Sequence, residues 1–251
     1  MSGRLGAIAA AGVVVPAHNE EALLPACLAA LRRTASALQV PVHLVVVADS
    51  CSDRTAAMAR AGNATVISLQ ARRVGAARAA GMRELLRLTS GLDPTAVWLA
   101  TTDADTVVPP RWLPRQLEYA SAGWDVVLGT VTVADWQGHP PHVPIAFEES
   151  YAFGSAPHTH VHGANLGIRA SAYLAAGGFR PLRTAEDHAL LAAATEAGCP
   201  VVQAGDITVE TSGRRLARAP RGFSSLLRNL ADRRVSHNSA PPGAIRPDPV
   251  R

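Results

Sequence analysis

Two aspartates follow a hydrophobic segment in the run WLATTDADTVVPP, and their spacing is the first candidate for chemistry. Asp103 and Asp105 stand two residues apart, so in an extended chain both side chains point to the same side. Such a pair can share a divalent cation, and hard oxygen ligands favour Mg²⁺ or Mn²⁺. An isolated D-x-D is also typical of an Asx turn at the end of a strand, so the spacing alone leaves both interpretations open.

Polar clusters follow three short hydrophobic runs of the chain. The segments PAHNE, ADSCSD and TDAD each come directly after such a run. In an open α/β sheet, ligands bind at the edge formed by the carboxyl ends of the strands. We therefore expect the three clusters to meet at one sheet edge and to form the functional site there.

Short β-branched runs alternate with longer segments rich in Ala, Leu and Arg. This alternation predicts a mostly parallel sheet joined by crossover helices. The expected strands cover residues 12–15, 44–47, 65–69, 96–101 and 126–133. The expected helices cover residues 20–37, 54–61, 74–88, 111–121, 170–176 and 186–197.

The sequence also indicates where two helices begin and where regular structure is interrupted. Asp53 and Thr184 have the residue types of helix N-caps, because their side-chain oxygens can accept from free backbone N–H groups. From Gln137 to Pro157 the periodicity fades and Gly, Pro and His accumulate. We expect an irregular excursion there, before the sheet resumes near Val161.

The last part of the chain differs from the rest. Residues 1–213 are expected to form one domain, 214–238 an Arg-rich helical extension, and the Pro-rich residues 239–251 a disordered tail. The extension contains one amphipathic helix, which we expect to dock on the domain, although peripheral contact with a membrane is an alternative. Its apolar face carries Phe223, Leu226, Leu227 and Leu230.

Composition limits the classes of protein. The 251 residues are 48% hydrophobic and 18% charged, which excludes a wholly disordered chain and a coiled coil. Aromatic residues make up only 4%, so a stacking platform for nucleic acid is not expected. The net charge of +4 comes from arginine alone, because the chain has no lysine. Arginine binds phosphate in a bidentate manner, although a solvated basic surface explains the same composition.

Cysteine usage and hydropathy bear on location. Three cysteines without a C-x-x-C pair exclude a disulfide scaffold and a zinc ribbon, and they favour a reducing cytoplasm. The apolar stretch near the start is interrupted by Pro16 and His18, and no apolar span of membrane length follows. We therefore expect neither a signal peptide nor a membrane helix.

Six motifs occur in a characteristic order: VVVPAHNEEALLPACLAAL, VVVADSCSDRT, VGAARAAGM, WLATTDAD, HGANLGIRASAYLAAGGF and AEDHALL. In this order the chain resembles the family 2 glycosyltransferases of the GT-A fold, over roughly residues 13–198. The resemblance implies a single α/β domain with a Rossmann-like, mostly parallel central sheet flanked by helices. It also implies a nucleotide-diphospho-sugar donor and an acceptor that offers a hydroxyl group.

The resemblance assigns a donor pocket residue by residue. Asp49 matches the acidic residue that contacts the base, and Arg78 matches an arginine that meets phosphate or sugar, although a surface arginine is an alternative. Gly163 and Asn165 match the segment that lines the donor sugar and the acceptor mouth. The first-strand signature against base and ribose is matched by Pro16, His18, Asn19 and Glu20.

The resemblance also assigns the reacting groups. Asp105 matches the residue that holds Mn²⁺ or Mg²⁺, and Asp103 matches its partner, which contacts ribose or sugar. Glu186 and Asp187 match the family's E-D pair, whose aspartate is the general base in an inverting transfer. An acidic pair is also common at a helix start, because carboxylates are favoured there.

Some features stay open or depart from the family pattern. Ala48 stands where many members have a further acidic residue, which leaves the base undefined. His158, His160 and His162 alternate, so a strand would present them on one face as metal ligands, substrate contacts or ordinary loop residues. Arg214 or Arg215, in the segment ETSGRR, could bind diphosphate or an anionic acceptor.

The leading hypothesis is a metal-dependent inverting glycosyltransferase that transfers a hexose-type sugar from a UDP- or GDP-linked donor. A binding protein without turnover would need Asp49 and Asp105 but not Asp187. A sugar-phosphate nucleotidyltransferase is disfavoured because no Gly-rich, Arg-bearing nucleotide signature opens the first strand. The sequence does not define the oligomeric state.

Overall fold

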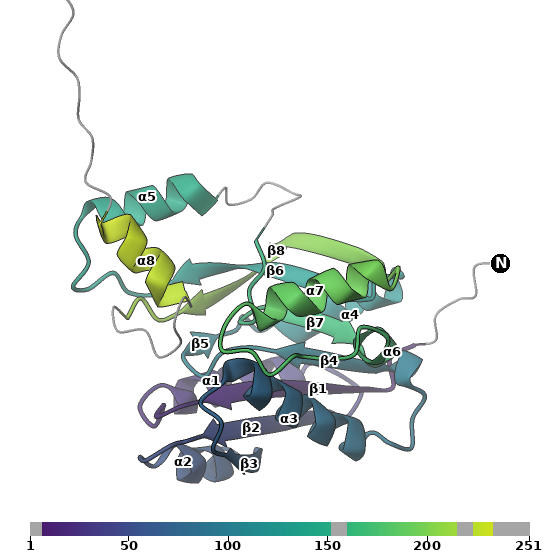
Figure 1. The fold of residues 1–251 in the computed structure, drawn as a ribbon. Coiled ribbons are helices and arrows are strands. Elements are labelled where there is room, and N and C mark those ends of the chain that lie inside the picture. Colours follow the sequence, from purple (N-terminus) through teal and green to yellow (C-terminus); the bar gives the residue numbers. More distant parts are fainter. Residues whose placement is uncertain (1–6, 152–159, 215–222, 233–251) are drawn as a thin grey trace, which may run out of the picture.

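A computed structural model describes residues 7–151, 160–214 and 223–232 of the chain, and its centre is an eight-stranded sheet. The strand order is β3-β2-β1-β4-β7-β6-β8-β5 (Figure 1). The first four strands of this order are parallel, and β8 is parallel to β6, whereas β7 and β5 are antiparallel to their neighbours. The strands are β1 (Ala10–Ala17), β2 (Val42–Asp49), β3 (Thr65–Leu69), β4 (Val97–Thr101), β5 (Thr106–Val107), β6 (Val126–Val133), β7 (Leu166–Arg169) and β8 (Val201–Thr211).

Helices cover both faces of the sheet, because successive side chains of each central strand point to opposite faces. Val13 and Val15 belong to one buried cluster and Val14 to the other. The first cluster includes residues of α1 (Leu24–Ala35), α2 (Thr55–Ala61) and α4 (Trp112–Ser121). The second includes residues of α3 (Val74–Leu88), α6 (Ala170–Ala175) and α7 (Glu186–Glu196), which lie in front of the sheet in Figure 1.

The expected α/β class is confirmed, and the strands and helices expected from the sequence are present. The structure corrects several expectations. A helix, α5 (His142–Tyr151), lies inside the predicted irregular excursion, of which residues 152–157 lie outside the described part. The sheet resumes at β7 rather than near Val161, and β8 was not expected at all. The N-cap of α2 is Arg54, not Asp53, and the N-cap of α7 is Ala185, not Thr184. Neither N-cap residue makes a side-chain cap.

The strand order brings the three polar clusters together, as expected. β1 lies between β2 and β4, and both neighbours run parallel to it, with Val13 opposite Leu44 and Ala100. All three strands therefore end at the same edge of the sheet, on the left in Figure 1. The clusters that follow them must meet there.

The amphipathic helix near the carboxyl end is docked on the domain. It forms α8 (Phe223–Asp232), and Leu227 and Leu230 are buried in the same cluster as Phe147 of α5. In Figure 1, α5 and α8 lie beside each other near the carboxyl ends of β6 and β8. The side chains of residues 223–226 and the tail at 239–251 lie outside the described part. Within the described residues, no helix has both the length and the apolar character that a membrane crossing requires.

Candidate active site

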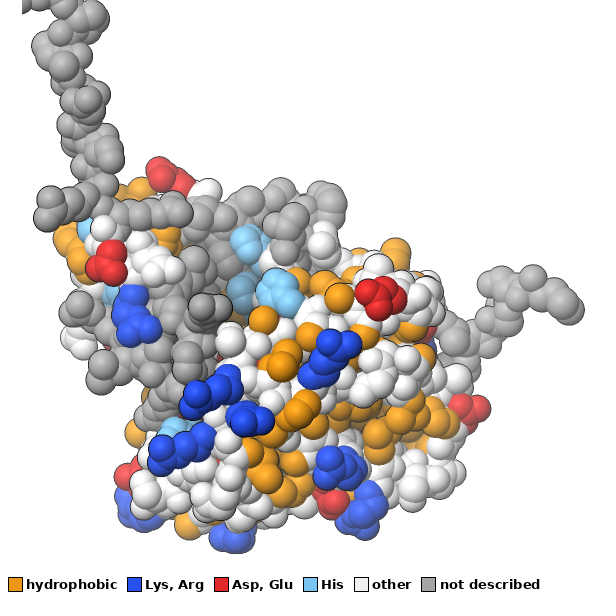
Figure 2. Space-filling view, viewed as in Figure 1, with side chains coloured by type: hydrophobic (Ala, Val, Ile, Leu, Met, Phe, Trp, Pro, Cys, Tyr) orange, Lys and Arg blue, Asp and Glu red, His pale blue; other side chains and the backbone are white. Residues whose placement is uncertain are grey.

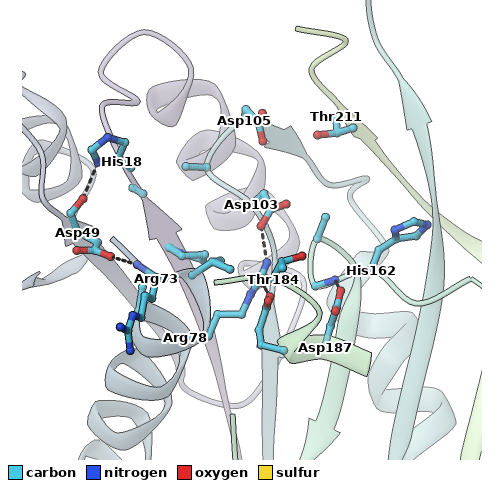
Figure 3. Close-up of a pocket in the computed structure, with 18 of the residues that line it drawn as sticks. His18, Asp49, Arg73, Arg78, Asp103, Asp105, His162, Thr184, Asp187 and Thr211 are labelled. Carbon is cyan, nitrogen blue, oxygen red and sulfur yellow. Dashed lines mark hydrogen bonds and ion pairs between the residues drawn. The ribbon is translucent and has the colours of Figure 1, made fainter. Parts of the chain in front are cut away.

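A cavity of about 770 Å³ opens at the carboxyl edge of the sheet. Its wall combines the ends of β1, β2 and β4 with the start of α3, the segment before β7, the start of α7 and the end of β8 (Figure 3). Every residue that the sequence predicted for the site lines this cavity, with the exception of Asn19 and Asn165. The volume is in the range that suits a nucleotide-sized ligand.

The side chains of the two exceptions, Asn19 and Asn165, hydrogen-bond to other parts of the protein. Asn19 has a left-handed backbone (φ 55°), and its side-chain oxygen accepts from the N–H of Ser52 at 2.8 Å. Asn165 is 1% exposed. Its amide donates to two backbone carbonyls, those of Thr130 and Ile207, and its oxygen accepts from the indole of Trp112. The bonding capacity of this amide is used inside the core, so direct contact with a donor is not supported at Asn165.

The carboxylate of Asp49 organises the loop that precedes α3. One oxygen accepts from the N–H groups of Ala71 (2.7 Å) and Arg72 (3.0 Å), and the other accepts from Arg73 N–H (3.0 Å). Burial opposes the charge of Asp49, but the three N–H groups and the hydroxyl of Ser50 outweigh it and lower the pKa. Asp49 therefore stays ionised and fixes residues 71–73 at the cavity rim.

Replacing Asp49 with asparagine should loosen this loop. The amide keeps one acceptor oxygen and turns an NH₂ group toward backbone donors, so we expect a loss of about 1–3 kcal/mol in the free energy of unfolding. Urea denaturation measures the change. Asp93→Asn is the control, because Asp93 accepts from one backbone N–H, that of Thr95, at an exposed turn. Equal effects of the two substitutions would contradict the role given to Asp49.

Arg78 is the buried cation beneath the cavity. Its guanidinium forms an ion pair with Glu186 and another with Asp103 at 2.5 Å, and its Nε donates to Thr101 at 3.1 Å. The surface position that the sequence left open for Arg78 is excluded, because its side chain is 4% exposed. A Cβ at Gly163 would lie 2.4 Å from the guanidinium carbon, so only glycine lets the chain pass so close.

Asp103 and Asp105 lie in a turn and not in an extended chain, which were the two geometries that their spacing left open. The N–H of Thr106 closes the turn on the carbonyl of Asp103 at 3.1 Å. The carboxylate of Asp105 pairs with Arg214, whose guanidinium also contacts Glu20 at 2.8 Å. Burial raises the pKa of Asp105 to about 6, and the charges of Asp103 and Glu20 add to this against the opposing effect of Arg214.

The chemistry of this acidic pair fits a hard divalent cation. Both residues offer carboxylate oxygens at the cavity wall, and a cationic side chain, Arg214, already lies against Asp105 and Glu20. In the part of the chain that the structure describes, no three His, Cys, Asp or Glu side chains are grouped as metal ligands. Mg²⁺ and Mn²⁺ are commonly held by one or two carboxylates together with substrate phosphates, so the pair suffices for a cation that arrives with a diphosphate.

Asp187 lies at the opposite wall of the cavity, at the start of α7 (Figure 3). One of its oxygens accepts from the N–H of Gly163 at 2.8 Å, and the other accepts from the N–H of His188 at 2.9 Å. Ala185 has a left-handed backbone (φ 59°), which turns the chain sharply into the helix. The two bonds fix the direction of the carboxylate, and the remaining lone pairs can still accept a proton.

Some cavity residues were not predicted from the sequence. Arg72, Arg73 and Arg183 lie at its rim. The run ARRVG directly before a helix was a sequence signal for Arg72 and Arg73, and Arg183 had none. His162 also lines the cavity, and its ring stacks on that of His160 at a centroid distance of 5.9 Å. These two histidines lie in a loop and not in the strand that an alternating pattern suggested, and His158 lies outside the described residues.

The fold and the site together define a layered α/β protein with acidic residues from separate segments around one cavity at the carboxyl edge of its sheet. The sequence profile of Glycosyl transferase family 2 matches residues 12–174. The chain belongs to this family.

Curated relatives agree with this membership. Undecaprenyl-phosphate 4-deoxy-4-formamido-L-arabinose transferase of Serratia proteamaculans (strain 568) is 32% identical over 133 residues, which cover 51% of this chain and 38% of the relative. The enzyme of the same name from Pseudomonas aeruginosa (strain LESB58) is 36% identical over 124 residues, 46% of this chain and 33% of the relative. The match thus spans only 33–38% of the length of these curated relatives.

Solved structures share the fold. S. aureus TarS 1-349, in complex with UDP-GlcNAc, has a TM-score of 0.61 at 17% identity. The superposed region covers 83% of this chain and 60% of the TarS chain. The mannosyltransferase PcManGT from Pyrobaculum calidifontis, in complex with GDP-Man and Mn²⁺, has a TM-score of 0.58 at 18% identity and covers 88% and 68%. The likeness confirms the expected GT-A architecture.

Proposed function

We propose that this protein is a metal-dependent, inverting glycosyltransferase that moves a hexose-type sugar from a UDP- or GDP-linked donor to an acceptor hydroxyl. The observation that carries the proposal is the convergence of Asp103, Asp105 and Asp187 on one cavity, from segments more than eighty residues apart. Fold relatives bind UDP-GlcNAc, and GDP-Man with Mn²⁺, in their own structures.

The donor occupies the cavity from the β2 side to the α7 side. The base and ribose lie against Pro16, His18 and Asp49, and the diphosphate lies at the acidic turn. When bound there through Asp105 and Asp103, Mn²⁺ or Mg²⁺ neutralises charge on the diphosphate leaving group. Arg214, which pairs with Asp105 and Glu20 at the same wall, would be within reach of a phosphate oxygen of a donor held there.

Asp187 serves as the general base. Its carboxylate takes the proton of the acceptor hydroxyl while the acceptor oxygen attacks the anomeric carbon. The bond from that carbon to the diphosphate oxygen breaks on the opposite side, so the configuration inverts. The backbone N–H of Gly163 holds one Asp187 oxygen in place, and the buried pair of Arg78 and Glu186 supports the wall beneath the sugar.

A panel of nucleoside diphosphates tests the donor assignment. UDP, GDP, CDP and TDP are added with and without Mn²⁺, and the melting temperature is recorded. A ligand at a hundred times its Kd should raise it by about 5–10 °C. We expect the Mn²⁺-dependent part of the shift to vanish in Asp105→Asn and to persist in the control Asp206→Asn, a surface carboxylate paired with Arg115. A melting-temperature shift that is the same with and without Mn²⁺, and the same in Asp105→Asn, contradicts metal dependence.

We also propose that the protein turns over its donor, that it is cytoplasmic, and that residues 214–238 extend the domain. Turnover of a donor with an acceptor hydroxyl separates an enzyme from a protein that only binds nucleotide sugars. All three cysteines are free thiols, in keeping with the cytoplasmic location expected from the sequence. The assignment of residues 214–238 as an extension of the domain is likewise proposed, with α8 docked as its described part.

A further inference from the structure

The arginines of the cavity fall into two groups. Arg78 and Arg214 are each held between carboxylates at the cavity wall. Arg72, Arg73 and Arg183 are exposed at the rim, and among the described residues no carboxylate lies within ion-pair distance of these three. We call these three residues the arginine rim. The inner positive charges of the cavity are compensated by the protein, whereas those of the rim face solvent.

The backbone holds the rim in a defined shape. Arg72 has a left-handed backbone (φ 49°), a conformation that few residues other than glycine adopt, and the bonds to Asp49 maintain it. The N–H of Gly75 donates to the carbonyl of Leu182 at 3.1 Å. A Cβ at Gly75 would lie 2.2 Å from the carbonyl of Arg180, so the two loops that carry the rim are in direct contact.

The surroundings add to the positive charge of the rim. α3 begins directly after Arg73, so the positive end of its dipole lies there. Figure 2 shows arginine side chains gathered over the N-terminal end of α3 and the segment that leads into α7. Guanidinium groups bind phosphate oxygens in pairs of hydrogen bonds, so a phosphate is the natural ligand of such a surface.

The rim is a different place from the proposed diphosphate site. In Figure 3 the side chain of Arg73 points away from Asp105, on the side of Asp49. Arg183 lies on the segment that leads to Asp187, and it lines the same cavity. A donor diphosphate bound at Asp103 and Asp105 therefore leaves the arginine rim available to a second anion.

We propose that the arginine rim binds a phosphate group of the acceptor, so that the acceptor is a hydroxyl compound that also carries a phosphomonoester or phosphodiester. This inference rests on the proposed function, because it uses the donor site to define what remains for the acceptor. The chemistry is the same for a soluble phosphate ester and for a phosphorylated lipid headgroup.

Titration of the nucleotide-loaded protein tests the rim. The protein is saturated with Mn²⁺ and the nucleoside diphosphate that binds most tightly, which fills the diphosphate site. Isothermal titration then compares inorganic phosphate and sn-glycerol 3-phosphate with glycerol. We expect saturable binding of the two phosphates in equimolar ratio and none of glycerol. The proposal is wrong if the loaded protein binds neither phosphate in these titrations and also fails to bind vesicles that contain phosphatidylglycerol.

Substitutions locate the binding. Arg183→Gln and the double variant Arg72→Gln/Arg73→Gln should each weaken phosphate binding by about tenfold or more, with the affinity for the nucleoside diphosphate changed less than threefold. The double variant Arg33→Gln/Arg60→Gln removes the same charge from exposed arginines elsewhere and should change neither affinity. Equal weakening of phosphate and nucleotide binding in the rim variants means that the rim serves the donor, and the proposal is then wrong.

Vesicles separate the two sources of phosphate. If the rim binds a lipid headgroup, the nucleotide-loaded protein should co-sediment with vesicles of phosphatidylcholine and phosphatidylglycerol. It should not co-sediment with vesicles of phosphatidylcholine alone. Arg183→Gln should reduce the co-sedimentation. A rim that takes a soluble ester should bind sn-glycerol 3-phosphate and neither vesicle. Either pattern supports the proposal. If no nucleoside diphosphate binds, the proposed function is wrong. That outcome differs from the one in which the nucleotide binds and the phosphate does not, which counts against the rim alone.

Discussion

Asp187→Asn should lower the turnover number of sugar transfer by about 10²–10⁴-fold while the protein still binds its donor. The substitution removes the basic oxygen pair but keeps the size of the side chain and one acceptor for the N–H of Gly163, 2.8 Å away in the wild type. Release of nucleoside diphosphate in the presence of acceptor measures turnover, and the melting-temperature shift with nucleotide measures donor binding.

A matched control lies on the same helix. Glu196→Gln at the end of α7 removes an equal charge from an exposed position and should leave turnover within about twofold, since surface changes of this kind have small effects. Full transfer by Asp187→Asn contradicts the base assignment. Loss of donor binding together with turnover contradicts it too, because Asp187 then supports the pocket rather than the proton transfer.

Most strands could be predicted because they are short runs rich in apolar and β-branched residues, which in β1, β4 and β6 are almost wholly buried. Residues 65–69 and 126–133 were expected with the same bounds that β3 and β6 have. Strands that are buried on both faces need β-branched side chains throughout, and such runs stand out against helices rich in alanine. The edge at which the site forms follows from the strand direction, so the meeting of the polar clusters could also be foreseen.

β8 and α5 could not be predicted because their neighbours in space decide their structure. The segment of β8, VVQAGDITVET, mixes polar and apolar residues, and it is a strand because β6 and β5 pair with both of its edges. α5 contains a proline and follows a proline pair, which are signals for a loop. It is stabilised by burial of Val143 and Phe147.

The site residues were found by their types, but their partners were not. Arg78 and Glu186 are 108 residues apart in the sequence, and Arg214 and Asp105 are 109 apart. No local pattern connects residues over such distances, so ion pairing between them was not foreseeable. The same holds for Asp49, whose carboxylate binds a loop more than twenty residues away.

Arg78→Met should lower the free energy of unfolding by about 3–5 kcal/mol, because it leaves the buried carboxylate of Glu186 without its counter-charge. The Glu186 side chain is 4% exposed, and burial already raises its pKa against the opposing effect of Arg78. For a protein of this size the melting temperature should fall by about 6–20 °C. Arg87→Met on the same helix is the control, since its pair with Glu84 is exposed and contributes about 0–1 kcal/mol.

The pH dependence separates the loss of charge from the loss of packing. Without Arg78, the pKa of Glu186 in the folded state rises further above its value in the unfolded chain. The unpaired charge then destabilises the variant at neutral pH, and this effect disappears as the pH falls and Glu186 takes up a proton. We therefore expect the gap in melting temperature between wild type and Arg78→Met to narrow toward acid pH, and Arg78→Met/Glu186→Leu to recover much of the loss. A gap that is the same at pH 5 and pH 8, with no recovery in the double variant, means that Arg78 acts through packing and not as the counter-charge of the site.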